Sequence, residues 1–170
     1  MKACKILGAV MLLAACAEQS LEVDVHKVSV EGIGADVGEI IISQGKEGVV
    51  FNVSLTGLPP GEHGFHVHEN PSCAVAEKNG EPVAALAAGG HYDPKNSGRH
   101  EGPYGKGHLG DLPKLIADEK GDVTMSVTAP RLKLKDLKGR TLMIHAGGDN
   151  YSDNPPMGGG GSRIACGVVY

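Results

Sequence analysis

Tryptophan is absent from this 170-residue chain, and the other aromatic residues are scarce, with two Phe and four Tyr. The hydrophobic core must therefore be built mainly from Val, Ile and Leu. Helical periodicity is nearly missing as well, whereas Gly (26 residues) and Pro (10 residues) are plentiful, which is typical of short strands joined by turns. The mean hydropathy of −0.12 and the mixed charge exclude a membrane protein with several spans.

The first residues of the chain are interpreted as a targeting segment with a positively charged start. Lys2 and Lys5 precede the short apolar stretch "ILGAVMLLAA", and "LAAC" follows and ends at Cys16. This motif resembles the lipobox of bacterial lipoproteins, in which the cysteine is lipidated and becomes the new N-terminus. We therefore expect a signal peptide over residues 1–16 with Cys16 as the mature start, and a single domain over 17–170. The alternative is ordinary signal-peptide cleavage after Ala17.

Both routes export the protein to the periplasm, either anchored to the outer membrane through Cys16 or soluble. The whole chain carries 16 Lys and Arg against 20 Asp and Glu, and loss of two lysines with the signal segment makes the mature domain more acidic. Such a domain is not a nucleic-acid binder. Of its four cysteines only Cys73 and Cys166 remain inside the domain, so a disulfide between them is expected in an oxidising compartment.

Strand-like runs recur along the chain with turns between them. At least seven runs alternate or are rich in β-branched residues, which predicts an all-β domain, an antiparallel β-sandwich or barrel. They cover residues 21–30, 38–44, 48–55, 63–69, 121–130, 140–148 and 162–170. Residues 132–139 are compatible with one helical turn.

Residues 70–120 show almost no periodic pattern, which is unusual for a compact domain unless something other than a core orders the loop. This loop contains His91, His100, His108 and Asp111. Three imidazoles and one carboxylate form a complete tetrahedral set for Zn²⁺, and a closed set of this kind is structural. A bound zinc ion would supply the order that the loop lacks.

Two further imidazoles, His66 and His68, occupy the expected strand 63–69. In an extended chain they point to one face and their neighbours Phe65 and Val67 to the other. Such a pair alone is as compatible with a wet sheet edge as with a metal site. His145, in the strand 140–148, adds a third nitrogen ligand, and an all-imidazole set suits copper.

Five segments carry a resemblance to a known family: "GFHVHE", "AGGHYDP", "GRHEGPYGKGHLGDLP", "MIHAGGDNYSD" and "GGGGSRIACGVV". They resemble copper/zinc superoxide dismutases of the bacterial periplasmic type, in the right order, from about residue 45 to 169. The resemblance implies a Greek-key β-sandwich or barrel with long metal-binding and electrostatic loops. It also implies superoxide as substrate and one copper and one zinc ion per chain. The sequence does not decide the oligomeric state, and a homodimer is one assembly that it permits.

The resemblance also implies roles at matching positions. Copper would be held by His66, His68, His91 and His145, and zinc by His91, His100, His108 and Asp111. Asp149 would tie a copper histidine to a zinc histidine, Cys73 and Cys166 would form the family disulfide, and Arg163 would be the active-site arginine. His91, between the two metals, would take part in catalysis by releasing copper and taking up a proton. Lys78 stands where a bacterial steering lysine is expected, and His63 is interpreted as structural.

Two other function classes compete with this enzyme. An envelope protein that stores or delivers copper or zinc could use the same fold, but storage needs neither a bridging histidine nor Arg163. A zinc hydrolase needs an open coordination position, and the set of three histidines and Asp111 leaves none.

Overall fold

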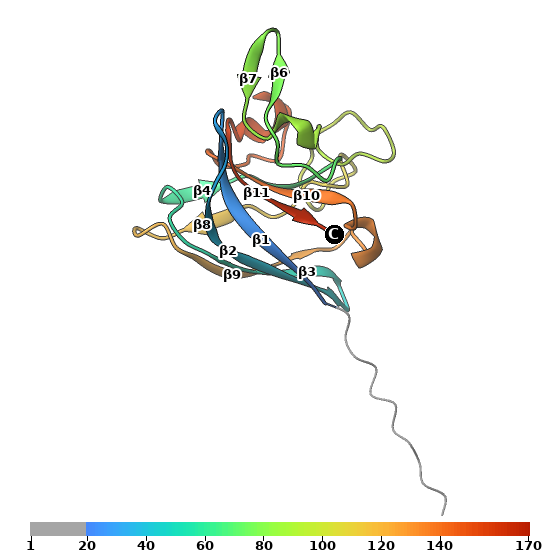
Figure 1. The fold of residues 1–170 in the computed structure, drawn as a ribbon. Coiled ribbons are helices and arrows are strands. Elements are labelled where there is room, and N and C mark those ends of the chain that lie inside the picture. Colours follow the sequence, from blue (N-terminus) through green and yellow to red (C-terminus); the bar gives the residue numbers. More distant parts are fainter. Residues whose placement is uncertain (1–19) are drawn as a thin grey trace, which may run out of the picture.

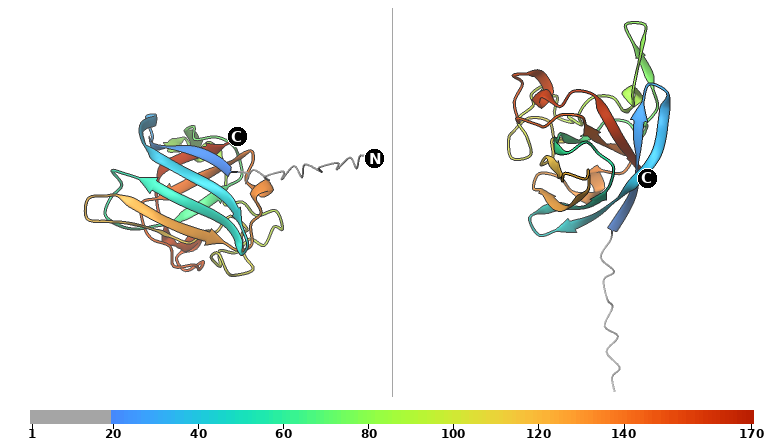
Figure 2. Two further views of the ribbon diagram at one scale, coloured as in Figure 1. Left: turned by 90° about the horizontal axis from the view of Figure 1, so that it is seen from below. Right: turned by 90° about the vertical axis from the view of Figure 1, so that its left-hand side faces the viewer.

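The computed structural model describes residues 20–170, so the expected signal segment 1–16, Cys16 and the alternative cleavage site at Ala17 lie outside the described residues. The described chain forms one seven-stranded antiparallel sheet in the order β5-β10-β11-β1-β2-β3-β9, and this sheet curls strongly (Figures 1 and 2). The expected all-β fold is confirmed. Its strands are β1 (Ser20–Ser29), β2 (Gly32–Gly45), β3 (Gly48–Leu55), β5 (Phe65–His68), β9 (Val123–Ala129), β10 (Arg140–His145) and β11 (Arg163–Val169).

The remaining elements are short and sit in the connections. β4 (Gly61–His63) pairs with β8 (Leu115–Ala117), and β6 (Ala76–Lys78) pairs with β7 (Glu81–Val83). Three 3-10 helices complete the described chain, η1 (Leu86–Ala88), η2 (Leu134–Asp136) and η3 (Pro156–Gly159). None of the helices in residues 20–170 is long and apolar enough to cross a membrane.

Strand β3 shows why these sequences form a sheet. Val49, Phe51, Val53 and Leu55 are buried on one face, and the polar residues between them are exposed on the other. This alternation is the period of two that an extended chain imposes. The same pattern over β1, β2 and β9 lines the inside of the curled sheet with aliphatic side chains.

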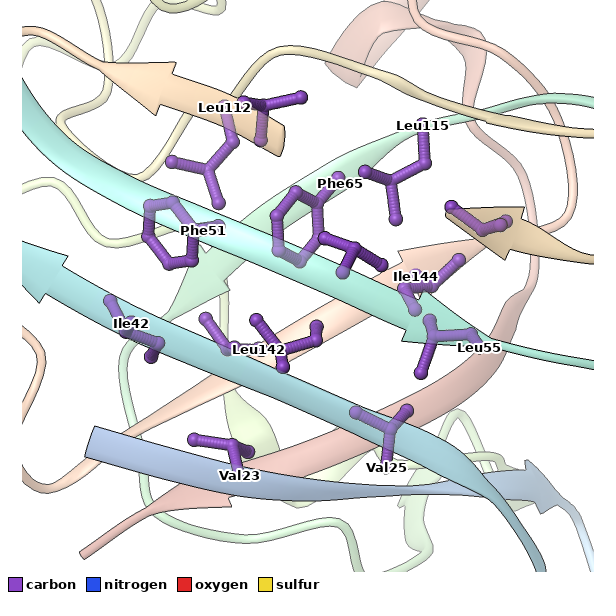
Figure 3. Close-up of a cluster of buried hydrophobic side chains, with 14 of the residues drawn as sticks. Val23, Val25, Ile42, Phe51, Leu55, Phe65, Leu112, Leu115, Leu142 and Ile144 are labelled. Carbon is purple, nitrogen blue, oxygen red and sulfur yellow. The ribbon is translucent and has the colours of Figure 1, made fainter. Parts of the chain in front are cut away.

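The core compensates for its few aromatic residues by placing both phenylalanines at its centre. Phe51 and Phe65 pack edge to face with ring centroids 5.6 Å apart. Aliphatic side chains from both halves of the sheet surround them, among them Ile42 and Leu142 (Figure 3). Because Phe65 belongs to β5, this packing fixes the strand that carries two of the candidate metal ligands.

Two sequence expectations need correction. The run 63–69 is not one strand, because His63 ends β4 and β5 begins only at Phe65. The loop 70–120 is not without secondary structure, since it contains the β6–β7 hairpin, η1 and β8. In the hairpin, Asn79 and Gly80 both adopt positive φ, at 57° and 84°, as a two-residue turn requires. The hairpin projects from the body of the molecule (Figure 1).

Candidate metal centre

The long loop is attached to the free side of strand β5, which pairs only with β10 in the main sheet. Val67 donates its backbone N–H to the carbonyl of Gly110 at 2.8 Å, and Tyr92 donates to the carbonyl of Val67 at 2.8 Å. Isolated bridges then place Asp111 beside His66 and His91 beside His68. The backbone therefore brings residues from both ends of the loop to the strand that carries the His-x-His pair.

One group of four buried imidazoles forms at this edge. His66, His68, His91 and His145 each offer a ring nitrogen, and these nitrogens lie within 4.8 Å of one another. The rings of His66 and His91 stack with centroids 3.9 Å apart. Four imidazoles buried this closely are costly unless a cation binds between them.

Each of three histidines in this group uses one ring nitrogen in a hydrogen bond and keeps the other unpaired. His68 donates from Nδ1 to the carbonyl of Gly89 at 3.0 Å, and His145 donates from Nδ1 to the carbonyl of Gly161 at 3.1 Å. His66 donates from Nε2 to Asp149 at 2.7 Å. The opposite nitrogens, Nε2 of His68 and His145 and Nδ1 of His66, are buried without a hydrogen-bond partner. These are the free lone pairs that a copper ion needs.

A second group forms around one oxygen of Asp111. This Oδ1 lies 3.1 Å from Nδ1 of His91, 3.0 Å from Nδ1 of His100 and 3.3 Å from Nδ1 of His108. The Nδ1 atoms of His100 and His108 are also buried without a hydrogen-bond partner. Three imidazole nitrogens and one carboxylate oxygen are the donor set of a closed zinc site.

The fourth member of the second group requires a choice between two histidines. A set of ligand atoms within 4.8 Å of one another contains His66, His91, His100 and Asp111, and omits His108. We favour His108, because its unpaired Nδ1 lies 3.3 Å from Asp111, whereas the one free nitrogen of His66 is already assigned to the four-imidazole group. His91 belongs to both groups.

Asp149 connects the two groups through hydrogen bonds to one histidine of each. Its carboxylate accepts from Nε2 of His66 at 2.7 Å and from Nε2 of His100 at 2.8 Å. Both acceptors leave the Nδ1 atoms of these histidines free for a metal ion. A third contact, from the backbone N–H of Tyr151 at 2.7 Å, holds the buried carboxylate in place.

The pKa shifts show that the four-imidazole group is neutral. Burial lowers the pKa of His66 and His68 well below the ordinary value and lowers that of His145 to about 4. Burial also lowers the pKa of His91. A metal ligand must be deprotonated, so these shifts suit metal binding.

The group around Asp111 favours positive charge instead. Burial alone would raise the pKa of Asp111 and Asp149, but hydrogen bonds with the neighbouring histidines outweigh it and hold both pKa values well below the usual range. Burial alone would lower the pKa of His100, but the carboxylates of Asp111 and Asp149, 3.0 Å and 2.8 Å from its two ring nitrogens, raise it to about 9. A bound divalent cation would supply the positive charge that these two carboxylates attract.

Arg163 lies next to the four-imidazole group, opposite His145 in the pairing of β10 with β11. Its guanidinium donates to the carbonyls of Ala85 and Gly89, each at 2.6 Å. Cys166, three residues later on the same strand, is bonded to Cys73, which confirms the expected disulfide. The half-buried arginine is therefore held between β11 and the loop that the disulfide attaches to it.

Three other predicted residues lie apart from this arrangement. His63 is buried behind it, with Nδ1 2.7 Å from the carbonyl of His145 and Nε2 2.7 Å from that of Pro59. Lys78 is exposed on the projecting β6–β7 hairpin. Cys16 falls outside the described residues.

The sequence reasoning missed residues that act through the backbone. A Cβ at Gly158 would lie 2.2 Å from Oδ1 of Asp149 and 2.7 Å from Nε2 of His100, and a Cβ at Gly160 would lie 3.1 Å from the Cβ of His145. The run "GGGG" at 158–161 is therefore a close approach of backbone to the candidate ligands, and the run itself was the available signal. Arg131, which binds carbonyls of the loop, had no signal in the sequence.

Comparison with known proteins gives one consistent family. The sequence model described as copper/zinc superoxide dismutase (SODC) matches residues 37–169. A curated relative from Salmonella typhimurium, superoxide dismutase (Cu-Zn) 2, is 53% identical over 167 residues and covers 96% of each chain. The solved Cu/Zn superoxide dismutase from Brucella abortus is 55% identical with a TM-score of 0.88, and the match covers 89% of this chain and 100% of the other. A monomeric copper, zinc superoxide dismutase from Salmonella enterica matches with a TM-score of 0.81, 53% identity and the same coverage.

Proposed function

The chain belongs to the copper/zinc superoxide dismutase family, and on that premise we propose that it protects the bacterial envelope from superoxide. It is an oxidoreductase whose substrate is superoxide and whose cofactors are copper and zinc. The residue roles, the envelope location and the lipid anchor are our proposals, and each rests on the contacts described above.

The four-imidazole group would hold copper, and the group around Asp111 would hold zinc. Copper supplies a one-electron redox cycle, in which one superoxide is oxidised to dioxygen and a second is reduced to hydrogen peroxide with two protons. The protein contributes the unpaired nitrogens of His66, His68 and His145, whose other nitrogens are fixed by hydrogen bonds. Those hydrogen bonds set the tautomers and keep the rings in place throughout the cycle.

His91 would serve both metals. Its Nδ1 faces Asp111 at 3.1 Å on the zinc side, so we assign Nε2 to the copper side. Of the residues that would hold copper, His91 is the one whose Nε2 could also hold or give up a proton. We therefore propose that His91 supplies a proton for the peroxide product, beside the one-electron chemistry that copper would supply.

Arg163 would bind and orient the anionic substrate. Two of its nitrogens donate to the carbonyls of Ala85 and Gly89. These hydrogen bonds would hold a permanent positive charge in the region beside His145. The full chain carries a net charge of −4, so the average field repels superoxide. A local cation at the site is therefore needed for fast capture.

The single observation that carries this proposal is the set of five buried imidazole nitrogens without partners, in two groups that share His91. We expect the purified protein to contain one copper and one zinc per chain. His145→Ala should lose copper and superoxide dismutation while keeping the fold, and His108→Ala should lose zinc and the order of its loop. Elemental analysis, circular dichroism and a superoxide-scavenging assay test this, and full activity in His145→Ala would refute it.

A storage or delivery role on the same fold predicts a different result. Such a protein would release copper readily to a chelator and would not turn over superoxide. A scavenging assay before and after chelation separates the two. The position of Arg163 beside His145 favours the enzyme, because metal storage does not require a cation that attracts anions.

The location is proposed from the first residues alone. The positive start, the apolar stretch and "LAAC" support export and lipidation at Cys16, hence a periplasmic protein held at the outer membrane. Export without lipidation, giving a soluble periplasmic protein, is the alternative. For the assembly, the Salmonella enterica relative is described as monomeric. Light scattering of the purified protein decides between a monomer and the homodimer that the sequence permits.

A further inference from the structure

Arg131 binds the loop that carries the zinc ligands at four points. Its Nε donates to the carbonyl of Pro103 at 2.9 Å and its Nη1 to that of Gly107 at 3.0 Å. Its Nη2 donates to the carbonyls of Gly102 at 3.0 Å and His108 at 2.5 Å. We propose that Arg131 is a positioning residue that orders this loop before zinc binds and so sets the zinc affinity; the inference rests on the proposed zinc site.

Apart from Arg131, single hydrogen bonds hold this loop. The N–H groups of His100, Glu101 and Lys106 donate to the carboxylates of Asp153, Asp111 and Glu101, respectively. Residues 99–108 contain no strand or helix. Within this segment, His108 donates its N–H to the carbonyl of Arg99 at 2.9 Å, and Gly105 donates to that of Gly102 at 3.4 Å. Gly102, Pro103 and Gly107 are buried, so water does not readily replace a lost donor at their carbonyls. The guanidinium of Arg131 fills that need.

The other end of Arg131 is anchored to the barrel. Arg131 lies two residues after Ala129, the last residue of β9, and its neighbour Leu132 is buried in the core. The loop carbonyls that it binds lie 23 to 29 residues earlier in the chain. Arg131 therefore connects four backbone carbonyls of the loop to the end of a sheet strand.

Only arginine suits this position. Its planar guanidinium offers five donors in a fixed fork and stays charged at any relevant pH. A lysine carries the same charge but presents three donors at a single point, so it cannot reach four carbonyls that surround a plane. Within residues 20–170 no carboxylate forms an ion pair with Arg131, so the group is devoted to the carbonyls.

The contacts act on the ligands directly. The carbonyl of His108 is one of the four acceptors, and the Nδ1 of the same residue lies 3.3 Å from Asp111. Gly102, a second acceptor, comes two residues after His100, the other candidate zinc ligand in residues 99–108. The copper histidines His66 and His145 lie on strands instead and do not need this support. Arg131 should therefore affect zinc far more than copper.

The test compares Arg131→Lys and Arg131→Ala with Arg99→Ala as the matched control. Arg99 belongs to the same loop but makes an exposed ion pair with Glu101 at 2.9 Å, an interaction that contributes little. Zinc and copper affinities are measured by competition with chromophoric chelators. Cobalt(II) is added as a spectroscopic probe of the zinc site, and hydrogen exchange of the metal-free protein reports loop order.

We expect both Arg131 variants to bind zinc roughly 10–100-fold more weakly, as is typical when a residue that supports ligands is lost. Copper affinity should change much less, the intense visible bands of tetrahedral cobalt should weaken, and amides 99–111 should exchange faster while those of the strands do not. Arg99→Ala should match the wild type. Arg131→Lys keeps the charge and length, so it supplies the measurement if Arg131→Ala fails to fold.

Two results would overturn the inference. One is zinc affinity and loop exchange in Arg131→Lys equal to those of the wild type. The other is an equal loss of zinc and copper affinity together with faster exchange of the strands, which would make Arg131 a general stability residue. A wild-type protein that binds no zinc would instead refute the proposed metal site, so the two failures are distinguishable.

Discussion

At the scale of single residues, the site depends on which nitrogen of each histidine is occupied. Asp149 accepts from Nε2 of both His66 and His100, and backbone carbonyls accept from Nδ1 of His68 and His145. One ring nitrogen is thus taken and the other left free in four separate rings. Histidine clusters that merely fill a core have no reason to share this arrangement, since the free nitrogens would remain unsatisfied.

Arg163 allows a sharp test of substrate capture. We expect Arg163→Glu to lower the second-order rate with superoxide by roughly 10-fold or more, because local charge sets the encounter rate with an anion. Both metals should stay bound, since the side-chain hydrogen bonds of the arginine go to the carbonyls of Ala85 and Gly89 and not to a candidate ligand. The rate should also lose much of its dependence on ionic strength. Pulse radiolysis at several salt concentrations measures both effects.

Lys135→Glu is the control for this charge reversal, because Lys135 is exposed on η2 and makes no ion pair within the described residues. It changes the net charge by the same amount and should alter the rate little. A wild-type rate in Arg163→Glu at low salt would make the arginine structural. Lys78 on the projecting hairpin would then be the next candidate for steering.

At the scale of elements, the sequence predicted the strands that bury one face and missed the shortest ones. Residues 48–55 match β3, and the runs at 121–130 and 162–170 match β9 and β11 within two residues. Three-residue strands such as β6 and β8 have too few residues to show a period of two. β8 also pairs with β4, a segment far earlier in the chain, and the local pattern does not contain that pairing.

The candidate ligands could be predicted from the sequence because metal sites accept few residue types. The structure brings the expected residues together. Their supporting contacts were less accessible. Arg131 binds backbone carbonyls, and any residue type supplies a carbonyl, so no pattern marks its partners. The break between β4 and β5 at Gly64 could not be predicted for a similar reason. The N–H of Gly64 donates to the carbonyl of Gly147, which is far away in the chain.

The disulfide is the element-scale feature with the clearest energetic prediction. It joins Cys73 to Cys166 across 93 residues and packs against Ala85 and Met143 in a small second core. Replacing both cysteines by serine should lower the free energy of unfolding by roughly 4–5 kcal/mol, the chain-entropy value for a loop of this length. Urea denaturation of the double variant and the wild type measures the difference.

The same variant should also be slower as an enzyme. The loop held by Cys73 carries the carbonyls of Ala85 and Gly89, which fix Arg163. Releasing that loop should therefore reduce superoxide turnover even without urea, at a pH and temperature at which the protein is fully folded. Unchanged turnover in the folded variant would contradict this link between the disulfide and the arginine.

At the scale of the whole molecule, the chain enters the sheet at the end remote from Arg163. Lys27, near the end of β1, pairs with Ala165, only two residues from Arg163. Ser20, the start of β1, pairs with Ser43 on β2 and lies seven residues back along the strand, about 23 Å at 3.3 Å per residue. An anchor attached shortly before Ser20 would therefore lie at the other end of the strand from the arginine.

Cys16 precedes Ser20 by four residues, so lipidation there would tether the protein at this remote end. We expect the mature protein to partition into detergent and to carry an acylated N-terminal cysteine, because acyl chains bury many methylene groups in the bilayer. Cys16→Ser should abolish detergent partition and leave metal content and superoxide turnover unchanged, since every candidate ligand lies within the described residues 20–170. Mass spectrometry of the mature N-terminus and phase separation measure both. An unmodified N-terminus at Glu18 in the wild-type protein would instead establish signal-peptide cleavage after Ala17 and a soluble periplasmic enzyme.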